Sequence, residues 1–503
     1  MKFVDLVQGL GLNNIQGGVD SDGAEIEDID CDSRQIKTGC AFVALKGANS
    51  DGHDFVRQAI DNGAVAIFSE RPLSDIWKGP SALLPGSPRQ VMARLARRVH
   101  GHPDKALKLI GVTGTNGKTT TTMLVRQLLM ASGMGCGLIG TVINAAGGHE
   151  EKAVLTSPES TSFFRLARRS LDAGDGALAA EVSSVAMAMD RVHGAKFSVG
   201  VFTNLTQDHL DFHNTMEAYY QAKSRLFAQC IRGLTNIEDE YGRRLLDENP
   251  GLIPYGLDSG AYRLEDLKLG HCGTSFTLVT PKKHFRVESP LLGRFNAYNA
   301  LAALSALDVA GFDLDALLGG MGALRGAPGR LERVDLGQPF GVMVDYAHTP
   351  DAIEKLLIAG RDLLSHGGRL HVLFGCGGDR DRSKRPIMAS AVVSGGADVI
   401  WHTSDNARSE DPERILDDAS KGIPEEIRLD QGRYRRITDR ALAVQSAIGD
   451  CRPGDLLLLA GKGHEPYQDL MGIKHPYSDR GAVEAAIRGE EIPRPWAIAE
   501  PTC

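Results

Sequence analysis

Residues 107–133 read "LKLIGVTGTNGKTTTTMLVRQLLMASG", and this stretch decides the fold at the centre of the chain. An apolar run typical of a buried β-strand leads into a glycine-rich turn, and an amphipathic helix follows from near Lys118. Glycines at 114 and 117 let backbone N–H groups close on phosphate oxygens, and the start of the helix adds the positive end of its dipole. Lys118 is expected to neutralise the β- and γ-phosphates, and the Thr119 hydroxyl to bind Mg²⁺. The stretch therefore predicts nucleotide binding, although Val112 and not glycine stands five residues before Gly117.

Two further strand ends carry polar groups that suit a metal–nucleotide site. The stretches are "ALAAEVSS" (177–184) and "VGVFTNLTQDHLDFH" (199–213), and the groups are Glu181, Asp208, His209 and Asp211. Ligands of an open parallel sheet bind at the carboxyl ends of its strands, so these loops should converge on the phosphate turn. Glu181 and His209 are candidate Mg²⁺ ligands, imidazole being the less usual one. The alternatives are a solvated loop acid for Glu181 and a loop cap for His209.

The whole chain is too long for one hydrophobic core, since 503 residues predict two to four domains. Short β-like runs alternate with helical stretches, which indicates α/β domains with largely parallel sheets. Polar, Gly/Pro-bearing joints stand at "HGHPDKALK" (100–108) and "LRGAPGRLERV" (324–334). We therefore expect domains at residues 1–105, 106–328 and 329–503.

The composition excludes several classes of protein. A hydrophobic content of 42% and a charged content of 24% describe a globular chain, and no 18-residue apolar run could span a bilayer. A net charge of -8 gives no general reason to bind nucleic acid. The amino terminus predicts no signal peptide, and eight scattered cysteines without CxxC pairs favour reduced thiols in a cytosol. We expect a cytoplasmic protein with small ligands and no membrane partner.

Six segments together resemble the Mur ligase family, whose members use ATP to join an amino acid or dipeptide to a carboxylate through an acyl phosphate. They are "TGTNGKTT", "EVSS", "TNLTQDHLDFH", "GRFNAYNALAA", "PGRLERV" and "DYAHTP", in the family's order. Three more, "DSRQIKTGCAFVALKGANSDGHDF", "GCGGDRDRSKRPIM" and "AGKGHEPYQ", resemble the diaminopimelate-adding members. The resemblance implies an α/β fold of three domains: a UDP-substrate-binding domain, a central P-loop ATPase domain and a Rossmann-like amino-acid-binding domain.

The resemblance also implies a reaction and its partners. The γ-phosphate of ATP would go to the D-glutamyl carboxylate of UDP-N-acetylmuramoyl-L-alanyl-D-glutamate, and the amine of meso-diaminopimelate would then displace phosphate. ATP and Mg²⁺ are the implied cofactors, and we expect a monomer. Lys118, His209 and Lys223 are the implied catalytic residues. Lys223, in "YYQAKSRLF", matches a lysine that the family carries carbamylated; the alternative is an exposed helix lysine.

The resemblance carries two sets of ligand-binding residues onto the chain. For ATP they are Gly114, Thr115, Asn116, Gly117, Lys118, Thr119 and Thr120 in the turn, Asn296 and Asn299 near the adenine, Arg330 and Asp345 toward phosphate and ribose, and His348 against the nucleotide. For the UDP-substrate they are Cys31, then Ser33, Ala48, Asn49 and Ser50 for the uridine diphosphate, and Thr156, Ser157, Ser183 and Arg191 for the muramoyl-peptide. Asn296 could instead be a helix N-cap. Val185 and Met189 depart from the family pattern, which bears on the peptide contacts.

The stretch "DNAR" (405–408), after the strand-like "DVIWHT", matches the loop that grips the distal carboxylate of diaminopimelate. A guanidinium can hold a carboxylate through two parallel hydrogen bonds, whereas it would repel the terminal ammonium of lysine. The implied diaminopimelate-binding residues are Arg385, Asp405, Asn406, Ala407, Arg408, Gly461 and Glu465. Ala407 replaces a usual proline, which loosens the loop. The alternative for Arg408 is an exposed ion pair with Glu410 or Asp411.

Other activities remain open at this point. A lysine-adding ligase or a folylpolyglutamate synthetase would share the ATP-binding segments, but not the amino-terminal "DSR" segment with the Arg408 loop. A nucleotide-regulated binding protein without ligase activity would share the phosphate turn, because such a turn implies binding and not turnover.

Overall fold

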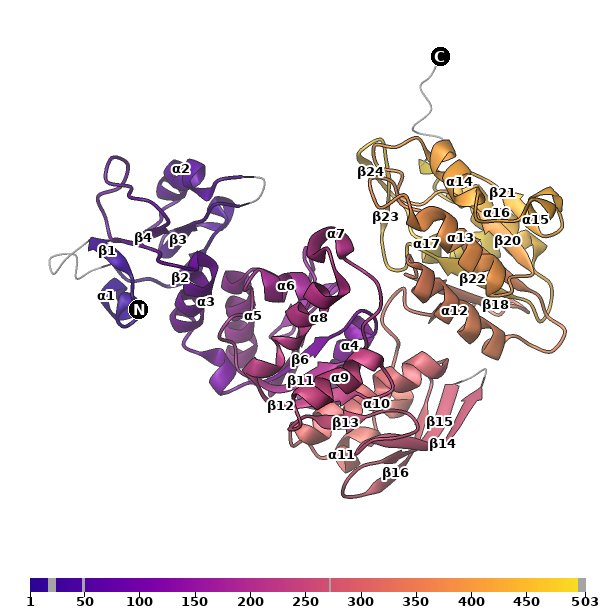
Figure 1. The fold of residues 1–503 in the computed structure, drawn as a ribbon, viewed down its shortest axis with the longest axis horizontal. Helices are drawn as coiled ribbons and strands as arrows, with labels where there is room; N and C mark the ends of the chain where they lie inside the picture. Colours follow the sequence, from indigo (N-terminus) through magenta and orange to yellow (C-terminus); the bar gives the residue numbers. More distant parts are fainter. Residues whose placement is uncertain (17–23, 48–49, 271–272, 496–503) are drawn as a thin grey trace, which may run out of the picture. The chain divides into compact units, whose positions relative to one another are not determined.

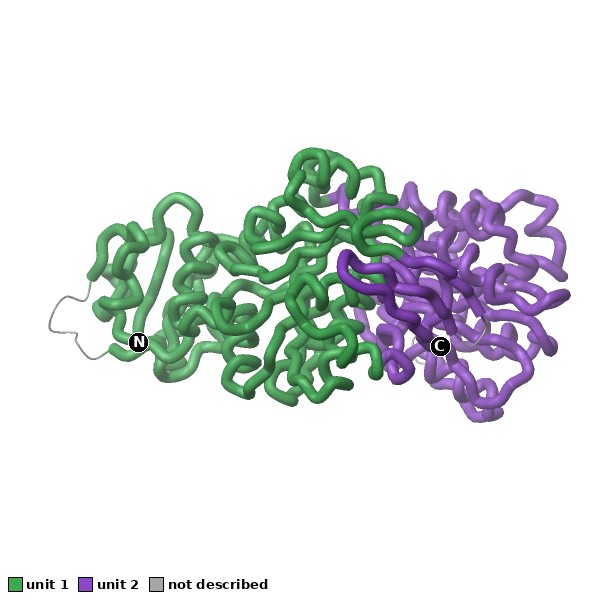
Figure 2. The backbone as a smooth tube through the Cα atoms, turned by 90° about the horizontal axis from the view of Figure 1, so that it is seen from below, with its two compact units in different colours: residues 1–205, 212–263, 301–320 green, residues 206–211, 264–300, 321–503 purple. Residues whose placement is uncertain are grey.

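The computed structural model describes residues 1–16, 24–47, 50–270 and 273–495. These residues form two compact units, each assembled from separate stretches of the chain (Figure 2). Unit 1 comprises Met1–Leu205, Phe212–Arg263 and Leu301–Gly320, and unit 2 comprises Thr206–Asp211, Leu264–Ala300 and Met321–Cys503. The short segment that carries His209 therefore belongs to unit 2. The domain boundaries expected near residues 105 and 328 stay a prediction.

Unit 1 begins with a five-stranded sheet in the order β1-β5-β4-β3-β2. Figure 1 shows this sheet beside α2 and α3. Its elements are α1 (Phe3–Val7), β1 (Asn13–Gln16), β2 (Asp28–Asp30), β3 (Cys40–Ala44), α2 (Val56–Asp61), β4 (Ala66–Ser69), β5 (Ser81–Leu83) and α3 (Pro88–Val99). Alternate residues of β3 enter different cores, because Val43 packs with Phe3 and Leu95 of α1 and α3, whereas Phe42 packs with Val56 of α2. Helices thus cover both faces of this sheet.

The centre of unit 1 is an eight-stranded sheet in the order β13-β12-β11-β6-β10-β7-β8-β9. Its strands are β6 (Lys108–Thr113), β7 (Cys136–Ile139), β8 (Ile143–Ala146), β9 (His149–Lys152), β10 (Ala177–Glu181), β11 (Phe197–Phe202), β12 (Cys230–Asn236) and β13 (Ile253–Tyr255). The strands from β13 to β7 run parallel to one another, whereas β8 runs antiparallel to both of its neighbours, β7 and β9. Glu181 pairs with Val112, and Phe202 pairs with Thr113, so β6, β10 and β11 end together at one edge.

The helix predicted after the glycine-rich turn is confirmed as α4 (Lys118–Ala131), which is followed by Gly133 with a φ of 82°. The other helices of unit 1 are α5 (Ser160–Asp172), α6 (Ser184–Ala188), α8 (Met216–Ser224), α9 (Glu240–Glu248) and α11 (Leu314–Leu318), and the helices α7 (Leu210–His213) and α10 (Arg294–Val309) each begin in unit 2 and end in unit 1. Short 3₁₀ helices are η2 (Ser33–Gln35), η3 (Gly52–Phe55), η4 (Pro103–Lys105), η5 (Phe227–Gln229) and η6 (Met321–Ala323).

Unit 2 contains a six-stranded sheet in the order β17-β18-β22-β19-β20-β21, a hairpin and a three-stranded antiparallel sheet. The strands are β14 (Arg263–Gly270), β15 (Gly273–Val279), β16 (His284–Ser289), β17 (Glu332–Arg333), β18 (Gly341–Asp345), β19 (Leu370–Phe374), β20 (Val399–His402), β21 (Tyr434–Arg436), β22 (Leu456–Ala460), β23 (Tyr467–Leu470) and β24 (Ile473–Pro476). The helices are α12 (Pro350–Leu363), α13 (Lys384–Ser394), α14 (Pro412–Ser420), α15 (Glu425–Leu429), α16 (Arg440–Asp450) and α17 (Asp479–Arg488).

Helices cover both faces of the six-stranded sheet. Leu458 packs with Leu357 of α12, whereas its neighbour Leu459 packs with Val444 of α16 and Val483 of α17. All five residues of β22 are buried, as expected of a parallel strand with two covered faces. The predicted α/β class, with a Rossmann-like carboxy-terminal part, is confirmed.

Two structural findings concern apolar helices and cysteines. In the described ranges, no helix has the length and apolar character needed to cross a bilayer. The six cysteines at positions 31, 40, 136, 230, 376 and 451 are free. Cys272 and Cys503 lie outside the described residues.

Candidate active site

The glycine-rich turn between β6 and α4 is held in place by the loop that follows β11. Gly114 has a φ of 147°, and a Cβ at this position would overlap with Oγ1 of Thr203. Only glycine fits there. Asn204 accepts the amide N–H of Thr115 through its carbonyl oxygen at 2.8 Å, and that of Asn116 through Oδ1 at 2.9 Å. The turn predicted to bind phosphate is thus preformed.

Two lysines bond to this turn. Lys118 Nζ donates to the carbonyl oxygens of Gly114 (2.9 Å) and Thr115 (2.8 Å). Lys223, on α8, is 1% exposed, and its Nζ donates to the same Gly114 oxygen at 2.7 Å. The Nζ atom also lies 4.6 Å from the ring centroid of Tyr219. The alternative of an exposed helix lysine at position 223 is wrong.

Glu181 ends β10 beside the turn and is 1% exposed, so the alternative of a solvated loop acid is also wrong. Its Oε2 accepts the hydroxyl of Thr119 at 2.9 Å, and its Oε1 accepts the amide N–H of Thr141 at 2.6 Å. A carboxylate and a hydroxyl are oxygen ligands of the kind that Mg²⁺ prefers. The described residues hold no group of three His, Cys, Asp or Glu side chains placed to bind a metal ion, but Mg²⁺ commonly takes only one or two protein ligands beside phosphate and water. Thr119 and Glu181 therefore fit the expected ion.

Four residues predicted to bind the muramoyl-peptide gather next to Glu181. The Ser157 hydroxyl donates to the Glu181 carbonyl oxygen at 2.8 Å and accepts the amide N–H of Ser183 at 3.0 Å. Arg191 Nη1 donates to the Ser157 carbonyl oxygen at 3.2 Å. The Thr156 hydroxyl lies 3.1 Å from the hydroxyl of Thr141, which also lies within hydrogen-bond distance of Glu181 Oε2. The structure brings these four residues to the carboxyl end of β10.

The residues predicted for the uridine diphosphate lie in the amino-terminal part of unit 1. Ser33 is buried, and its hydroxyl donates to Gln58 Oε1 at 2.7 Å. Burial, with Asp30 and Glu159 nearby, raises the pKa of the Cys31 thiol to about 12. Ser50 is exposed. Ala48 and Asn49 lie outside the described residues, and the uridine contacts stay a prediction.

His209, the third predicted metal ligand, lies in the segment that belongs to unit 2. Its φ is 52°, its side chain is 49% exposed, and Nε2 is 3.6 Å from Asp208 Oδ2. Burial acts to raise the pKa of Asp208, but His209, His348 and Lys384 outweigh it and the pKa is lowered. Asp208 is therefore a carboxylate at neutral pH. The metal-binding role of His209 stays a prediction.

Asn296 and Asn299 lie inside α10. Because α10 begins at Arg294, Asn296 is its third residue and the N-cap alternative is wrong. Asn296 Nδ2 donates to the Leu292 carbonyl oxygen at 2.9 Å, and Asn299 Nδ2 donates to Asn296 Oδ1 at 3.2 Å. Asn296 thus ties the first turn of the helix to the residues before it.

The remaining predicted ATP contacts of unit 2 gather around Tyr346. Asp345 ends β18, and burial raises its pKa although Arg330 and His348 act in the opposite direction. Its Oδ2 accepts the Leu331 amide N–H at 2.6 Å. The guanidinium of Arg330 lies 4.8 Å from the Tyr346 ring centroid, and the His348 ring meets that ring edge-on at 4.6 Å. The structure therefore brings Arg330, Asp345 and His348 together.

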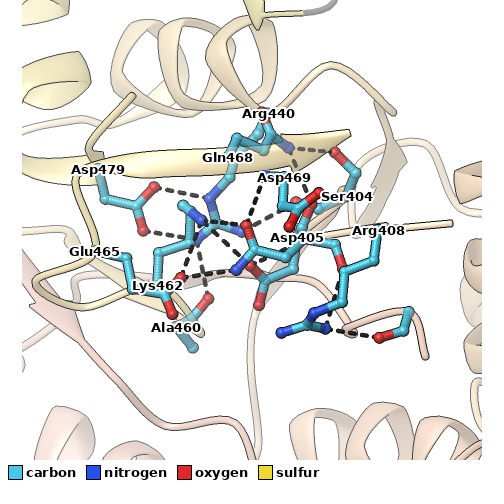
Figure 3. A network of polar contacts seen from close by, with 12 residues as sticks. Ser404, Asp405, Arg408, Arg440, Ala460, Lys462, Glu465, Gln468, Asp469 and Asp479 are labelled. Atoms are coloured by element: carbon cyan, nitrogen blue, oxygen red, sulfur yellow. Dashed lines mark hydrogen bonds and ion pairs between the residues drawn. The ribbon is translucent and has the colours of Figure 1, made fainter. Parts of the chain in front are cut away.

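The "DNAR" loop follows β20 and meets the loop that follows β22 (Figure 3). Lys462, 0% exposed, donates to Asn406 Oδ1 at 3.0 Å and to Glu465 Oε2 at 3.2 Å, and lies 3.5 Å from Asp405 Oδ1. Asn406 Nδ2 also donates to Glu465 Oε2 at 2.8 Å. Burial acts to raise the pKa of Asp405, but Lys462 and Arg440 outweigh it, so the pKa is lowered. Two carboxylates, one amide and one ammonium thus form a connected polar cluster.

Arg408 closes this loop with a φ of 52°. Its amide N–H donates to the Asp469 carbonyl oxygen at 3.0 Å, and Nη1 donates to the Gly378 carbonyl oxygen at 2.6 Å. Among the described residues it forms no ion pair, so the alternative of a pair with Glu410 or Asp411 is wrong. A guanidinium anchored by main-chain oxygens keeps its charge available for a carboxylate.

Arg385 is placed differently. Its guanidinium is buried and pairs with Glu410 at 2.7 Å and Asp418 at 3.1 Å. Two acids of the chain already neutralise it, although its buried Nε has no hydrogen-bond partner in the described part of the chain. Of the two arginines predicted to bind the amino acid, Arg408 is the one without an ion pair there, although its charge acts on the Asp379 carboxylate.

Comparison with known proteins decides the family. The Mur ligase family catalytic domain matches residues 25–100, the Mur ligase middle domain residues 112–307, and the Mur ligase glutamate ligase domain residues 329–463. The UDP-N-acetylmuramoyl-L-alanyl-D-glutamate--2,6-diaminopimelate ligase of Geobacillus kaustophilus is 43% identical, with 92% of this chain and 95% of the relative covered.

The chain belongs to the Mur ligase family. The ligase of the same name from Geobacter metallireducens is 40% identical over 97% of this chain and 98% of its own. A solved structure with that name is 34% identical, covers 97% of this chain and 99% of its own, and has a TM-score of 0.68. Mur ligases are ATP-dependent ligases, and this chain is one of them.

Three residues of this Mur ligase site were missed in the sequence. Lys462 stands inside "AGKGHEPYQ", between Gly461 and Glu465, yet a lysine is the residue least expected to be fully buried. Thr141 and Tyr346 bond or pack against predicted residues. The position of Tyr346 in "DYAHTP" was a usable signal, whereas Thr141 belongs to none of the quoted segments.

Proposed function

We propose that this Mur ligase adds meso-diaminopimelate to the D-glutamyl carboxylate of UDP-N-acetylmuramoyl-L-alanyl-D-glutamate, with conversion of ATP to ADP and phosphate, in peptidoglycan precursor synthesis. The relatives at 40 to 43% identity carry this activity in their names. The observation that carries the choice of amino acid is Arg408, which is oriented by the Gly378 carbonyl oxygen and forms no ion pair within 4 Å among the described residues. A second carboxylate is what distinguishes diaminopimelate from lysine.

The first half of the reaction forms an acyl phosphate. The amides at the start of α4 and the Lys118 ammonium would hold the phosphates of ATP, so that the glutamyl carboxylate can attack the γ-phosphorus and ADP can leave. Mg²⁺, held by Thr119 and Glu181, would supply positive charge to the phosphoryl group. Ser157, Ser183 and Arg191 border Glu181 and would orient the peptide carboxylate toward the turn.

Lys223 is proposed to act as a carbamate. Its amine would add CO₂ and release one proton, which converts a buried donor into an anion of charge −1. Lys223 already lies against the phosphate turn, 2.7 Å from the Gly114 carbonyl oxygen. A carbamate there would face Lys118 and orient the transferred phosphoryl group, and His209 is proposed as a further catalytic and metal-binding residue.

The second half joins the amine to the acyl phosphate. Asp405, whose pKa is lowered, and Glu465 would bind the ammonium groups of the amino acid, while Arg408 and Arg385 would bind its carboxylates. Asn406 bonds Glu465 directly at 2.8 Å and fixes the separation of the two acids. The free amine would attack the acyl carbon, and phosphate would leave.

The test is release of phosphate from ATP with meso-diaminopimelate and lysine assayed side by side. Release that needs both the UDP-muramoyl-dipeptide and meso-diaminopimelate is expected. Preference for lysine would show that the amino acid is wrongly assigned, and binding of ATP without substrate-dependent release would leave a nucleotide-binding protein. We also propose that the protein is cytoplasmic and is a monomer. Light scattering at assay concentration measures the molar mass and so checks the monomer.

A further inference from the structure

Arg440 and Asp479 form an ion pair in unit 2 in which both side chains are 0% exposed. Arg440 Nε donates to Asp479 Oδ1 at 2.7 Å, and Nη2 donates to Oδ2 at 2.6 Å (Figure 3). Arg440 is the first residue of α16, and Asp479 is the first residue of α17. The two-pronged contact therefore fixes the starts of two helices against each other.

The remaining N–H groups of Arg440 hold the main chain at two strand ends. Nη1 donates to the carbonyl oxygen of Ser404 at 3.2 Å, and Nη2 donates to that of Ala460 at 3.0 Å. Ser404 directly precedes Asp405, and Ala460 ends β22 directly before Gly461. β20 and β22 do not pair, because β19 lies between them. Arg440 thus joins two strand ends that share no ladder of hydrogen bonds.

The two loops approach closely at this point. Gly461 has a φ of 115°, and a Cβ added there would lie 2.9 Å from Asp405 Oδ2. The buried side chain of Gln468 reinforces the arrangement, because Nε2 donates to Ser404 Oγ at 2.9 Å and to the Asp405 carbonyl oxygen at 3.1 Å. Little room exists for either loop to move without a change in the position of the Asp405 carboxylate.

A buried ion pair seldom adds stability over apolar residues of the same volume, because both charges lose their hydration. A stabilising role alone therefore does not explain why Arg440 is buried here. Its hydrogen bonds to the Ser404 and Ala460 carbonyl oxygens indicate instead that it places the two loops that follow. We infer that Arg440, oriented by Asp479, is a positioning residue. It sets the spacing between the loop after β20, which carries Asp405, and the loop after β22, which carries Glu465, and so tunes binding of the amino acid. This inference rests on the proposed function, since it takes these loops as the amino-acid site.

The first variant is Arg440→Lys, which keeps the charge but loses the planar fork that bonds one carboxylate and two carbonyls at once. Because small misplacements of binding groups are costly, the KM for the amino acid should rise between about tenfold and about 100-fold. The KM for the UDP-substrate should stay within about twofold, since its predicted contacts lie in unit 1. The KM for ATP should rise less than that for the amino acid, although the predicted ATP contact Asp345 pairs with Ala460 at the end of β22. Asp479→Asn, which keeps the shape of the side chain, should give the same pattern more weakly.

The matched control is Arg369→Lys at the opposite end of β22, where this strand begins. Arg369 directly precedes β19, and its Nη2 donates to Oδ2 of Asp455, the residue directly before β22, at 2.8 Å. This ion pair ties the start of β19 to the start of β22, but it bonds no residue of the two loops. Arg369→Lys should lower the melting temperature and leave every KM unchanged.

The outcome is read from the KM values and the melting temperatures together. If Arg440→Lys behaves like Arg369→Lys, with a lower Tm and an unchanged KM for the amino acid, the positioning role is wrong; should Arg440→Lys not fold, Asp479→Asn decides by the same criterion. All KM values are measured with whichever amino acid the parent enzyme uses. A parent enzyme that prefers lysine therefore overturns the proposed substrate without touching the inference, and one that uses no amino acid overturns both.

Discussion

Lys118 and Lys223 share one acceptor, because both Nζ atoms donate to the carbonyl oxygen of Gly114, at 2.9 and 2.7 Å. Lys118 opens α4, and Lys223 lies in the last turn of α8, so two helices bring cations to one turn. Like charges repel most strongly where little water screens them. A carbamate on Lys223 would replace this repulsion by attraction to Lys118, and it would do so at the turn that is proposed to hold the phosphates.

Replacement of Lys223 by alanine is expected to lower turnover about 100-fold or more, since removal of one preorganised electrostatic group commonly costs that much. Short carboxylates such as formate or acetate should restore part of the activity by occupying the space of the carbamate. Phosphate release from ATP measures both effects. Lys421→Ala, at a side chain that is exposed and pairs with Asp418, is the control and should be neutral. Full turnover of Lys223→Ala would contradict the carbamate.

Replacement of Glu181 by glutamine is expected to raise the Mg²⁺ concentration for half-maximal turnover by about tenfold or more, because the amide keeps the size of the side chain but loses its charge. Thr119→Ala should act in the same direction, since the two groups lie 2.9 Å apart. A Mg²⁺ titration at fixed ATP provides the measurement. Glu151→Gln, at an exposed position of β9, is the control. An unchanged titration curve for Glu181→Gln would place the metal elsewhere.

Local sequence was sufficient for the turn and for the strand ends around it. Gly114 and Gly117 lie between an apolar run and a helical period, and both signals depend on near neighbours in the chain. The end of β10 at Glu181 followed from the same kind of pattern. The alternation of strands and helices also indicated parallel sheets, because parallel strands need crossover connections.

Contacts between distant residues could not be predicted in the same way. Lys223 meets Gly114 across 109 positions, and Arg408 meets Gly378 across 30. Whether such a side chain is exposed depends on how helices and loops pack, so the residue type alone favoured a solvated lysine and a surface ion pair. Lys462 was missed for the same reason. Only where the two loops meet do Asn406 and Glu465 offset the cost of burying its ammonium group.

Asp455 should make the stability of unit 2 depend on pH. Burial acts to raise its pKa, but hydrogen bonds from Arg369 and from the Arg452 amide outweigh it and lower the pKa to about 2. Because this folded value lies below the unfolded value of 3.8, the stabilisation is complete above about pH 4 and is lost as the pH falls toward about 2. Asp455→Asn should therefore melt below the parent at neutral pH.

The difference in melting temperature between parent and Asp455→Asn should narrow once the pH is lowered below about 4, because the parent then loses its carboxylate. Differential scanning fluorimetry over a pH series measures it. Asp362→Asn, at an exposed position of α12, is the control and should change the melting temperature little. A gap for Asp455→Asn that stays constant into acid would show that the ion pair with Arg369 is not its source.

Replacement of Arg408 by lysine is expected to raise the KM for meso-diaminopimelate about 100-fold, since two charge-assisted hydrogen bonds to one carboxylate become at most one. The KM for ATP should not change, because Arg408 bonds Gly378 and Asp469, which lie outside the predicted ATP contacts. Steady-state kinetics with each substrate varied in turn gives the KM for meso-diaminopimelate and the KM for ATP separately.

Arg382→Lys is the control, because Arg382 is exposed and pairs with Glu410 at 2.9 Å. If Arg408→Lys weakened binding of ATP as much as binding of the amino acid, Arg408 would stabilise the structure of unit 2 in general and would not bind the distal carboxylate. A selective loss ties the choice of building block to one guanidinium held by main-chain oxygens.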